Sequence, residues 1–356
     1  MRRRAENERN RADVVLAYPA GRPGNPYTAL LYSALTEQGW RVDDLAFTPR
    51  AIFRSGLPTV LHVHWPEQVA ATTTRGRALA RLLFYAALLL RCRIGRRPIV
   101  WTVHNLHPHD SPYRRVAQTA IALTRWTSSG VVFMSRVAEA RFRERYLRAP
   151  ASLIVRHGDL SVEYGPLPER SEARRRLGVD PEAVLIVAFG HVRAYKNLGQ
   201  LLEAFRSVDD ARWQLLVMGK ADALSARLLQ GVATLDKRVL LHLRFQSNLE
   251  LSTALAASDL VCIPFAEVLH SGSAHLAASA GRSVLVPDIG SLGEMRAEFA
   301  TGQVIVYRPP LTGATLAEGV ADALRQRDRR GLTEAQNWKD IAASHKDFFK
   351  DLAVLR

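Results

Sequence analysis

The sequence predicts an α/β protein made of two Rossmann-like domains that face each other. The chain has 356 residues, too many for one ordinary core and enough for two domains of about 150 to 180 residues each. Short apolar runs rich in β-branched residues alternate with helical patterns, which is typical of a doubly wound parallel sheet. This series of runs occurs twice along the chain.

The first half of the chain contains the first series. The apolar character of each run is continuous rather than alternating, which indicates strands that are buried on both faces of a parallel sheet. We expect these strands at residues 14–18, 60–64, 99–104, 131–134 and 153–155.

The second half repeats the scheme, with strands expected at residues 184–189, 215–218, 239–245, 260–264, 284–287 and 304–307. Between the two series, residues 165–168 read Gly-Pro-Leu-Pro, a composition typical of a hinge. The predicted domains are therefore residues 1–165 and residues 166–335.

Residues 336–356 carry an apolar stripe at helical spacing, which predicts an amphipathic helix. Such a helix has to bury its stripe, either by crossing back onto the first domain or by capping the second domain alone. Periodicity leaves both arrangements open, and we predict packing on the first domain.

Composition narrows the class of protein. Hydrophobic residues make up 47% and charged residues 23%, which excludes a disordered or collagen-like chain. Cys92 and Cys262 are too few for a disulfide framework or a cysteine metal site. The first fifteen residues carry charge without an apolar stretch, so we expect no secretory signal and a cytoplasmic protein.

The positive charge is concentrated in the first half. Residues 1–165 hold 25 Arg and no Lys against 12 acidic residues, a net charge of +13. A basic surface attracts nucleic acid, anionic lipid or phosphorylated ligands, and it can also be an ordinary solvated face. The chain lacks a recognition helix, an aromatic RNA-binding signature and a basic stripe along both domains, so we expect no nucleic-acid partner.

Two loops of the second domain have the composition of an anion site. In doubly wound sheets, ligands bind where the carboxyl ends of the strands open into loops. After the strand at 184–189, Gly190 allows close approach, while Arg193 and Lys196 supply a bidentate donor and a point charge for a diphosphate. Surface charge alone could produce the same spacing.

The second such loop follows the strand at 260–264. Ser271, Gly272 and Ser273 open a helix, whose amides and hydroxyls attract an anion, although an ordinary N-cap has the same composition. Glu267 is placed to accept hydrogen bonds from sugar hydroxyls. Two such loops at one sheet edge predict a phosphate or diphosphate site.

Histidines gather after two strands of the first domain, at His62, His64, His104, His107 and His109. They lack a clear open-site triad, so we predict no metal. Buried structural histidines and an acid/base or phosphate-contacting role both stay open.

An apolar segment at residues 82–90 is bracketed by arginines, with Arg77, Arg81, Arg91 and Arg93 as candidates for a membrane face. The segment is much shorter than the roughly 20 residues needed to cross a bilayer. It can lie among lipid headgroups, held by anionic lipid, or be a Rossmann helix buried against its sheet. Both interpretations stay open.

Taken together, the motifs resemble the GT-B glycosyltransferases, and among them the β-mannosyltransferases of xanthan-type polysaccharide assembly. The motifs are NPYTALLYSAL (25–35), VLHVHWPEQ (60–68), VWTVHNLHPHD (100–110), FGHVRAYKN (189–197) and LHSGSAHLAASAGRSVLVP (269–287). The resemblance implies transfer of mannose from GDP-mannose, with inversion, onto a polyprenyl-diphosphate-linked oligosaccharide at the inner face of the cell membrane. It implies a role in exopolysaccharide biosynthesis.

Carried over residue by residue, the resemblance assigns Arg193, Lys196, Ser271, Gly272 and Ser273 to the donor diphosphate. It places Gly190, Phe245, Leu249, Glu267 and His270 near the donor nucleoside or sugar. Asn25, Tyr27 and Asp110 fall on the acceptor side.

An inverting mechanism needs a base from the first domain, for which Glu67 and His104 are the candidates. The cationic groups make a metal cofactor unnecessary for stabilising the leaving diphosphate. His275 stands where many retaining relatives have a second glutamate, which counts against retention. The alternatives are a retaining GT-B enzyme with another GDP- or UDP-sugar, or a nucleotide-sugar-binding protein that is not a transferase.

Overall fold

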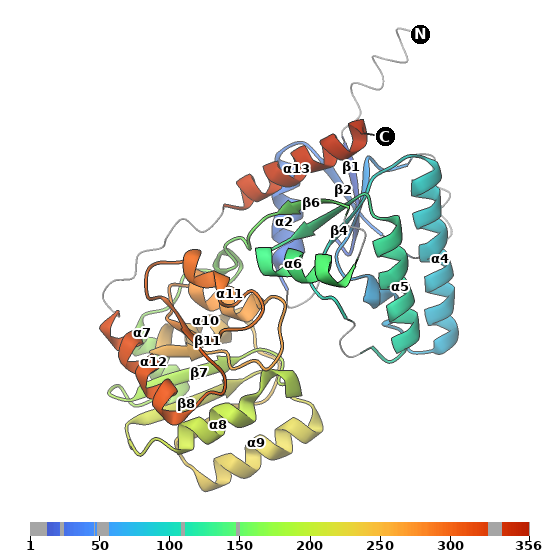
Figure 1. The fold of residues 1–356 in the computed structure, drawn as a ribbon. Helices are drawn as coiled ribbons and strands as arrows, with labels where there is room; N and C mark the ends of the chain where they lie inside the picture. Colours follow the sequence, from blue (N-terminus) through green and yellow to red (C-terminus); the bar gives the residue numbers. More distant parts are fainter. Residues whose placement is uncertain are drawn as a thin grey trace. The chain divides into compact units, whose positions relative to one another are not determined.

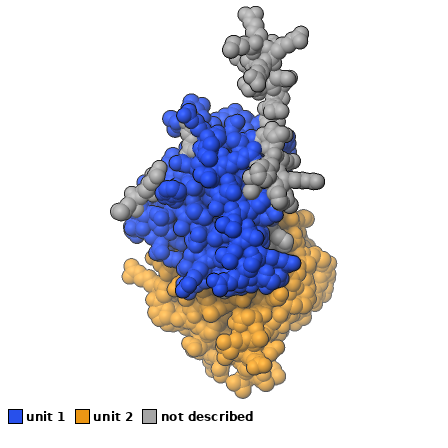
Figure 2. All heavy atoms as spheres, turned by 90° about the vertical axis from the view of Figure 1, so that its right-hand side faces the viewer, with its two compact units in different colours: residues 1–158, 336–356 blue, residues 159–335 orange. Residues whose placement is uncertain are grey.

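The computed structural model describes residues 13–21, 25–45, 47, 57–107, 111–146, 150–326 and 337–355. The chain forms two compact units (Figures 1 and 2). Unit 1 comprises Met1–Gly158 and Gln336–Arg356, and unit 2 comprises Asp159–Ala335. Each unit has its own parallel sheet with flanking helices, which confirms the predicted fold class.

The described part of unit 1 contains a six-stranded sheet in the order β2-β1-β3-β4-β5-β6, with every pairing parallel. The central strands β3 and β4 are buried along their whole length, as their continuous β-branched composition predicts. The strands are β1 (Val14–Tyr18), β2 (Arg41–Asp44), β3 (Val60–Val63), β4 (Ile99–Thr102), β5 (Gly130–Phe133) and β6 (Ala151–Ile154).

The two edge strands of this sheet differ from the prediction. The edge strand β2 was not predicted, because its sequence Arg-Val-Asp-Asp is polar and carries no apolar run. β6 was predicted as a buried strand, but it is the other edge of the sheet and is largely exposed. An edge strand has a neighbouring strand on one side only and is more exposed to solvent, so it does not need a continuous apolar run.

The helices of unit 1 are α2 (Tyr27–Glu37), α4 (Arg75–Ile94), α5 (Arg114–Thr127), α6 (Arg136–Arg145) and α13 (Trp338–Val354), together with the short η1 (Pro66–Ala70). α13 lies beside α2 (Figure 1), and Gln38 Nε2 donates to Lys339 O at 2.7 Å. A Cβ on Gly158 would lie 2.5 Å from the Trp338 ring, so the absence of a side chain there lets the helix pack closely. The terminal helix therefore buries its stripe in unit 1.

Unit 2 contains a second six-stranded parallel sheet in its described residues, ordered β12-β11-β10-β7-β8-β9. The strand order reverses between β7 and β10, and a crevice for ligands opens at such a switch point. The strands are β7 (Val184–Phe189), β8 (Trp213–Met218), β9 (Val239–His242), β10 (Leu260–Cys262), β11 (Val284–Pro287) and β12 (Val304–Tyr307). The helices are α7 (Arg170–Leu177), α8 (Leu198–Arg206), α9 (Ala223–Leu235), α10 (Asn248–Ala257), α11 (Gly272–Ser279) and α12 (Gly313–Arg325), with the short η2 (Ser161–Glu163), η3 (Ala194–Lys196) and η4 (Glu294–Ala297).

The boundary between the units falls after Gly158, before the predicted hinge at residues 165–168. The intervening segment is held by unit 2, since Asn248 Nδ2 donates to Glu163 O at 3.2 Å and η2 packs against α11. Asp159 Oδ1 also accepts from the backbone N–H of Ser161 at 2.8 Å. Such polar contacts leave no pattern in the sequence, so the exact boundary between the units could not be predicted from hydrophobic periodicity.

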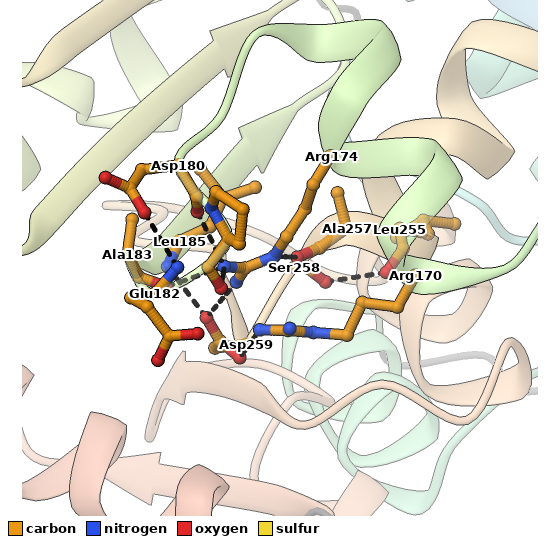
Figure 3. A network of polar contacts seen from close by, with 11 residues as sticks. Arg170, Arg174, Asp180, Glu182, Ala183, Leu185, Leu255, Ala257, Ser258 and Asp259 are labelled. Carbon is orange, nitrogen blue, oxygen red and sulfur yellow. Dashed lines mark hydrogen bonds and ion pairs between the residues drawn. The ribbon is translucent and has the colours of Figure 1, made fainter.

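A buried ion pair joins the amino-terminal ends of β7 and β10, away from the ligand edge (Figure 3). Arg174 is buried and bonds Asp259 at 2.7 Å, and Arg170 bonds the other oxygen of this carboxylate at 2.7 Å. Arg174 also donates to the carbonyls of Asp180, Pro181, Ala183 and Ala257. The pair is thus fully hydrogen-bonded, and its place in the fold indicates a structural function.

Candidate active site

The loops that follow β7, β8 and β10 come together at the switch point of unit 2. Ala266 N donates to Tyr195 O at 2.9 Å, which ties the loop after β10 to η3. Val192 N donates to Lys220 O at 2.9 Å, which ties the loop after β7 to the loop after β8. A backbone hydrogen bond therefore holds the two predicted anion-binding loops together, and a second one joins the loop after β8 to them.

Gly190 lies at the centre of this junction. Its φ of +102° is strained for other residues, and a Cβ there would lie 2.9 Å from Lys196 Nζ and 3.0 Å from Ser273 Oγ. Gly219 has a φ of +137°, and a Cβ on it would lie 2.1 Å from Gly190 O. The missing side chains thus leave a site at which a cation and a hydroxyl converge, as a diphosphate requires.

Lys196 is the buried cation of the site, with 7% of its surface exposed. Its Nζ lies 4.3 Å from the centre of the Phe265 ring, and both residues line a cavity together with Gly190 and Met218. Burial lowers the pKa of Lys196 to about 7. Among the described residues no carboxylate lies within ion-pair distance of Nζ, so a bound anion would supply the missing counter-charge.

The three small residues at the start of α11 have different positions. Ser271 is buried and caps its own helix, since its hydroxyl accepts from Ala274 N at 3.1 Å. Gly272 is exposed, and Ser273 faces Gly190. The N-cap interpretation is therefore correct for Ser271, and the anion-site prediction for Gly272 and Ser273 stays a prediction.

Other predicted donor residues surround this centre. Arg193 is half-buried, and its charge adds to the hydrogen bonds from Ser225 in lowering the pKa of Asp222, which places it toward the start of α9. Phe245 and Leu249 are exposed, as an apolar surface for a base requires, although Phe245 lies beyond the end of β9. Glu267 is exposed as well.

The two histidines of the second motif lie in different surroundings. His270 is half-buried, with both ring nitrogens shielded from solvent. His275 is buried on α11 with its Nδ1 4.0 Å from Glu298 Oε2. The position of the second glutamate of retaining relatives is thus occupied by a histidine that faces a carboxylate.

In unit 1, the histidines at the ends of β3 and β4 form a hydrogen-bonded cluster. His62 and His64 lie on one face of β3, and Tyr32 Oη bridges them at 3.0 Å from His62 Nδ1 and 2.7 Å from His64 Nε2. His62 Nε2 is 2.8 Å from Thr102 Oγ1, and His64 Nδ1 is 3.0 Å from His104 Nε2. Tyr32 was not predicted as part of this cluster, because its position on α2 matches the helical spacing of core residues.

Burial keeps these imidazoles neutral. It lowers the pKa of His62 and His64 well below the usual range, and that of His157 and His345 to about 4. His104 stacks on Trp65 at 4.2 Å and is 8% exposed. No group of three or more His, Cys, Asp or Glu in the described ranges is arranged to hold a metal ion.

The remaining predicted residues of unit 1 are less central. Glu67 is half-buried on η1, and its charge adds to burial in raising the pKa of Tyr18 and Tyr85. Asn25 Oδ1 accepts from Tyr27 N at 3.1 Å. Tyr27, predicted on the acceptor side, is buried with 1% exposure and packs edge-on against His104 and other rings. Asp110 lies outside the described residues.

The Arg-flanked segment forms helix α4, which has one buried face and one exposed face. Its inner face, which includes Tyr85 and Leu88, is buried. Its outer face exposes apolar side chains that recur at helical spacing, with Leu83 72% and Ile94 75% exposed. In the part of the chain that the structure describes, no helix is long and apolar enough to cross a membrane.

The arginines around this outer face fall into two groups. Arg93 is exposed and Arg91 half-exposed, both near Leu90 and Ile94. Arg81, in contrast, is half-buried and lies 4.2 Å over the Phe47 ring, and Arg77 is exposed near Thr73 and Thr74 at the beginning of the helix. The α4 face is defined here as Leu79, Leu83, Leu90 and Ile94 with Arg91 and Arg93.

The two doubly wound parallel sheets, each with its flanking helices, define the GT-B architecture. Residues 183–326 match the family model for glycosyl transferases group 1. Unit 2 therefore carries a glycosyl transferase group 1 domain, and the chain is a glycosyltransferase.

Known proteins are similar over most of the chain. A GDP-mannose:glycolipid 4-beta-D-mannosyltransferase of Xanthomonas campestris pv. campestris is 28% identical over 324 residues, which cover 90% of this chain and 86% of that protein. HepE of Anabaena in complex with UDP has a TM-score of 0.67 at 17% identity, covering 96% of this chain and all of that one. Sucrose-phosphate synthase of Thermosynechococcus elongatus has a TM-score of 0.72 at 15% identity and covers 97% of this chain and all of that one. The structural matches confirm the predicted GT-B fold.

Proposed function

We propose that this glycosyltransferase moves mannose from GDP-mannose onto a lipid-linked oligosaccharide in bacterial polysaccharide assembly, with inversion and without a metal cofactor. The buried ammonium of Lys196 beside Gly190 and Ser273 is the observation that supports a nucleotide diphosphate as ligand. The choice of mannose and of a glycolipid acceptor is supported by the Xanthomonas relative named above.

In the proposed mechanism, unit 2 stabilises the leaving nucleoside diphosphate. Glycosyl transfer passes through an oxocarbenium-like state while negative charge grows on the departing diphosphate. Lys196, the Ser273 hydroxyl and the amides at the start of α11 are placed to meet that charge in a partly enclosed cavity, where electrostatic interactions are strong. This set of donors makes a divalent cation unnecessary in the proposed mechanism.

In the proposed mechanism, unit 1 supplies the base that removes a proton from the acceptor hydroxyl. His104 is our first candidate, because at 8% exposure it is less deeply buried than His62 and His64, to which it is linked. Glu67 is the second candidate. His275 counts against retention, since a histidine facing Glu298 stands where many retaining relatives have a second glutamate, but it does not by itself establish inversion.

The α4 face supports a peripheral position on an anionic membrane. Exposed leucines and an isoleucine flanked by arginines suit the headgroup layer, where apolar side chains enter the lipid and guanidinium groups meet phosphate. A lipid-linked acceptor would be presented at that surface.

Calorimetric titration with GDP, UDP, GDP-mannose and UDP-glucose tests the donor. We expect GDP and GDP-mannose to bind, and Lys196→Met to weaken binding by about 10- to 100-fold, the effect of one charge-assisted contact. Lys237→Met, at an exposed lysine of the same unit, is the matched control. Binding of UDP instead would overturn the mannosyl assignment, and no nucleotide binding would overturn the catalytic proposal.

Product analysis tests the acceptor and the anomeric configuration of the transferred sugar. Incubation with GDP-mannose and a polyprenyl-diphosphate-linked oligosaccharide should extend the acceptor by one β-linked mannose. An α-linked product would instead show a retaining enzyme.

A further inference from the structure

The loop after β11 packs against the loop after β10, which carries Glu267. The two strands are parallel neighbours, so the loops at their carboxyl ends lie side by side. The Glu267 loop is defined here as residues 267–270 and the supporting loop as residues 288–293. Ser291 N donates to Leu269 O at 3.2 Å, so the two loops are joined through their backbones.

Gly290 makes this close contact possible. Its φ is +55°, and a Cβ there would lie 2.1 Å from Val268 O and 3.4 Å from Leu269 O. A carbon atom cannot lie so close to a carbonyl oxygen, and a backbone carbonyl cannot turn aside as the end of a flexible side chain can. Any side chain at Gly290 would therefore push the backbones of the two loops apart.

The supporting loop is the more firmly held of the two. Asp288 N donates to Tyr307 O at 2.8 Å, Leu292 N donates to Ile289 O at 3.1 Å, and the Leu292 side chain is fully buried. In the Glu267 loop, Glu267 is exposed and the other three residues are half-buried. Since the loop with fewer buried groups yields more easily, a collision at Gly290 would displace the Glu267 loop.

Both ends of the Glu267 loop lie at the predicted diphosphate site. The loop begins two residues after Phe265, whose ring centre is 4.3 Å from Lys196 Nζ. It ends at Ser271, the buried N-cap of α11, and this helix carries Ser273 beside Gly190. A sugar attached to a diphosphate at this site would lie next to the Glu267 loop.

We propose that Gly290 is a positioning residue for the donor sugar, because it lets the supporting loop hold Glu267 where its carboxylate accepts hydrogen bonds from the sugar hydroxyls. This inference rests on the proposed function. Hydrogen bonds to substrate hydroxyls discriminate strongly between related substrates, and they depend on the position of the accepting group. Gly290 thus acts on the sugar, whereas Gly190, Lys196 and Ser273 act on the diphosphate.

Gly290→Ala tests the inference by separating the two halves of the donor. We expect kcat/KM for GDP-mannose to fall about 10- to 100-fold, the effect of displacing a substrate-positioning group by about 1 Å. The affinity for GDP should stay close to that of the wild type, because the contacts at Gly190 are untouched. Calorimetry measures GDP binding, and a transfer assay measures the use of GDP-mannose.

Gly281→Ala is the matched control. Gly281 follows α11 and has a φ of +72°, but a Cβ there meets open space, so alanine carries the backbone cost without the collision. This variant should retain both GDP binding and transfer. The inference would be overturned by an unchanged kcat/KM in Gly290→Ala, by an equal loss in Gly281→Ala, or by a loss of GDP affinity as large as the loss in kcat/KM.

Hydrogen exchange of the wild-type protein gives a second test that needs no variant. The amide of Ser291 reports on the contact directly, because it is bonded to Leu269 O. GDP-mannose should slow exchange at Ser291 and in residues 267–270 more than GDP does, since the sugar supplies the added contact. Equal protection in a protein that transfers mannose would overturn this inference alone. Wild-type protein that binds GDP but gains neither affinity nor transfer from GDP-mannose would contradict the proposed function, and this inference with it.

Discussion

The ammonium of Lys196 lies 4.3 Å from the centre of the Phe265 ring, in a place where burial brings its pKa down to about 7. A lysine is rarely buried without an acidic partner, because the charged form loses its hydration. The ring face offers a weak substitute for a counter-ion. A nucleotide diphosphate would offer a strong one.

Nucleotide binding should therefore take up a proton. In the free enzyme burial lowers the pKa of Lys196 to about 7, and a bound diphosphate raises it again, so affinity should fall as the pH rises above 7, by up to about tenfold per unit. Titration with GDP in buffers of different ionisation enthalpy measures the uptake. Lys196→Met should abolish it, and uptake that persists in this variant would assign the proton to another group.

Gly190→Ala should weaken GDP binding by at least about tenfold, because the new methyl group would occupy the place where Lys196 and Ser273 converge, on a backbone that disfavours it. Gly178→Ala is the matched control. Gly178 also has a positive φ, +66°, but open space around it, so it carries the backbone cost without the steric one. Calorimetry with GDP compares the two variants, and equal affinities would place the ligand elsewhere.

The fold and the loops that form the site could be predicted from the sequence, but the contacts between side chains within the site could not. Continuous β-branched runs such as Val184–Phe189 predict buried parallel strands, and the switch-point rule then selects the loops. β2 was missed because a polar edge strand lacks that signal. The apposition of Lys196 and Ser273 depends on the positive φ of Gly190, which a single sequence does not reveal.

The histidine cluster, too, could be predicted only in part from the sequence. His62 and His64 could be assigned to one face of a strand from their spacing. Their link through Tyr32 could not, because α2 and β3 are separated in sequence and tyrosine at a helical apolar position is ordinary core composition. The burial of the Tyr27 ring could not be predicted either, because it depends on packing against Trp338 of α13, which composition does not specify.

Arg174→Met should destabilise unit 2 by about 3 to 5 kcal/mol, because it leaves the buried carboxylate of Asp259 without its main partner. Arg175→Met removes an exposed ion pair to Glu172 one position along the same helix, and it should cost less than about 1 kcal/mol. Denaturant unfolding measures both values. GDP affinity of the folded protein should be unchanged in each variant, since the pair lies at the opposite ends of the strands, and a loss of affinity would show that it supports the donor site.

Membrane binding should depend on the α4 face. Replacing Leu83 and Ile94 together by aspartate puts two charges where the proposal needs apolar contact, so flotation with vesicles of phosphatidylcholine and phosphatidylglycerol should fall several-fold. Neutralising Arg91 and Arg93 should remove the preference for anionic lipid at about 1 kcal/mol per residue. Leu235→Asp is the control, since Leu235 is 75% exposed, as is Ile94, but lies in unit 2 beside Asp236. GDP binding should persist in all three variants, and flotation that is equally strong with the altered α4 face would exclude this surface as the membrane contact.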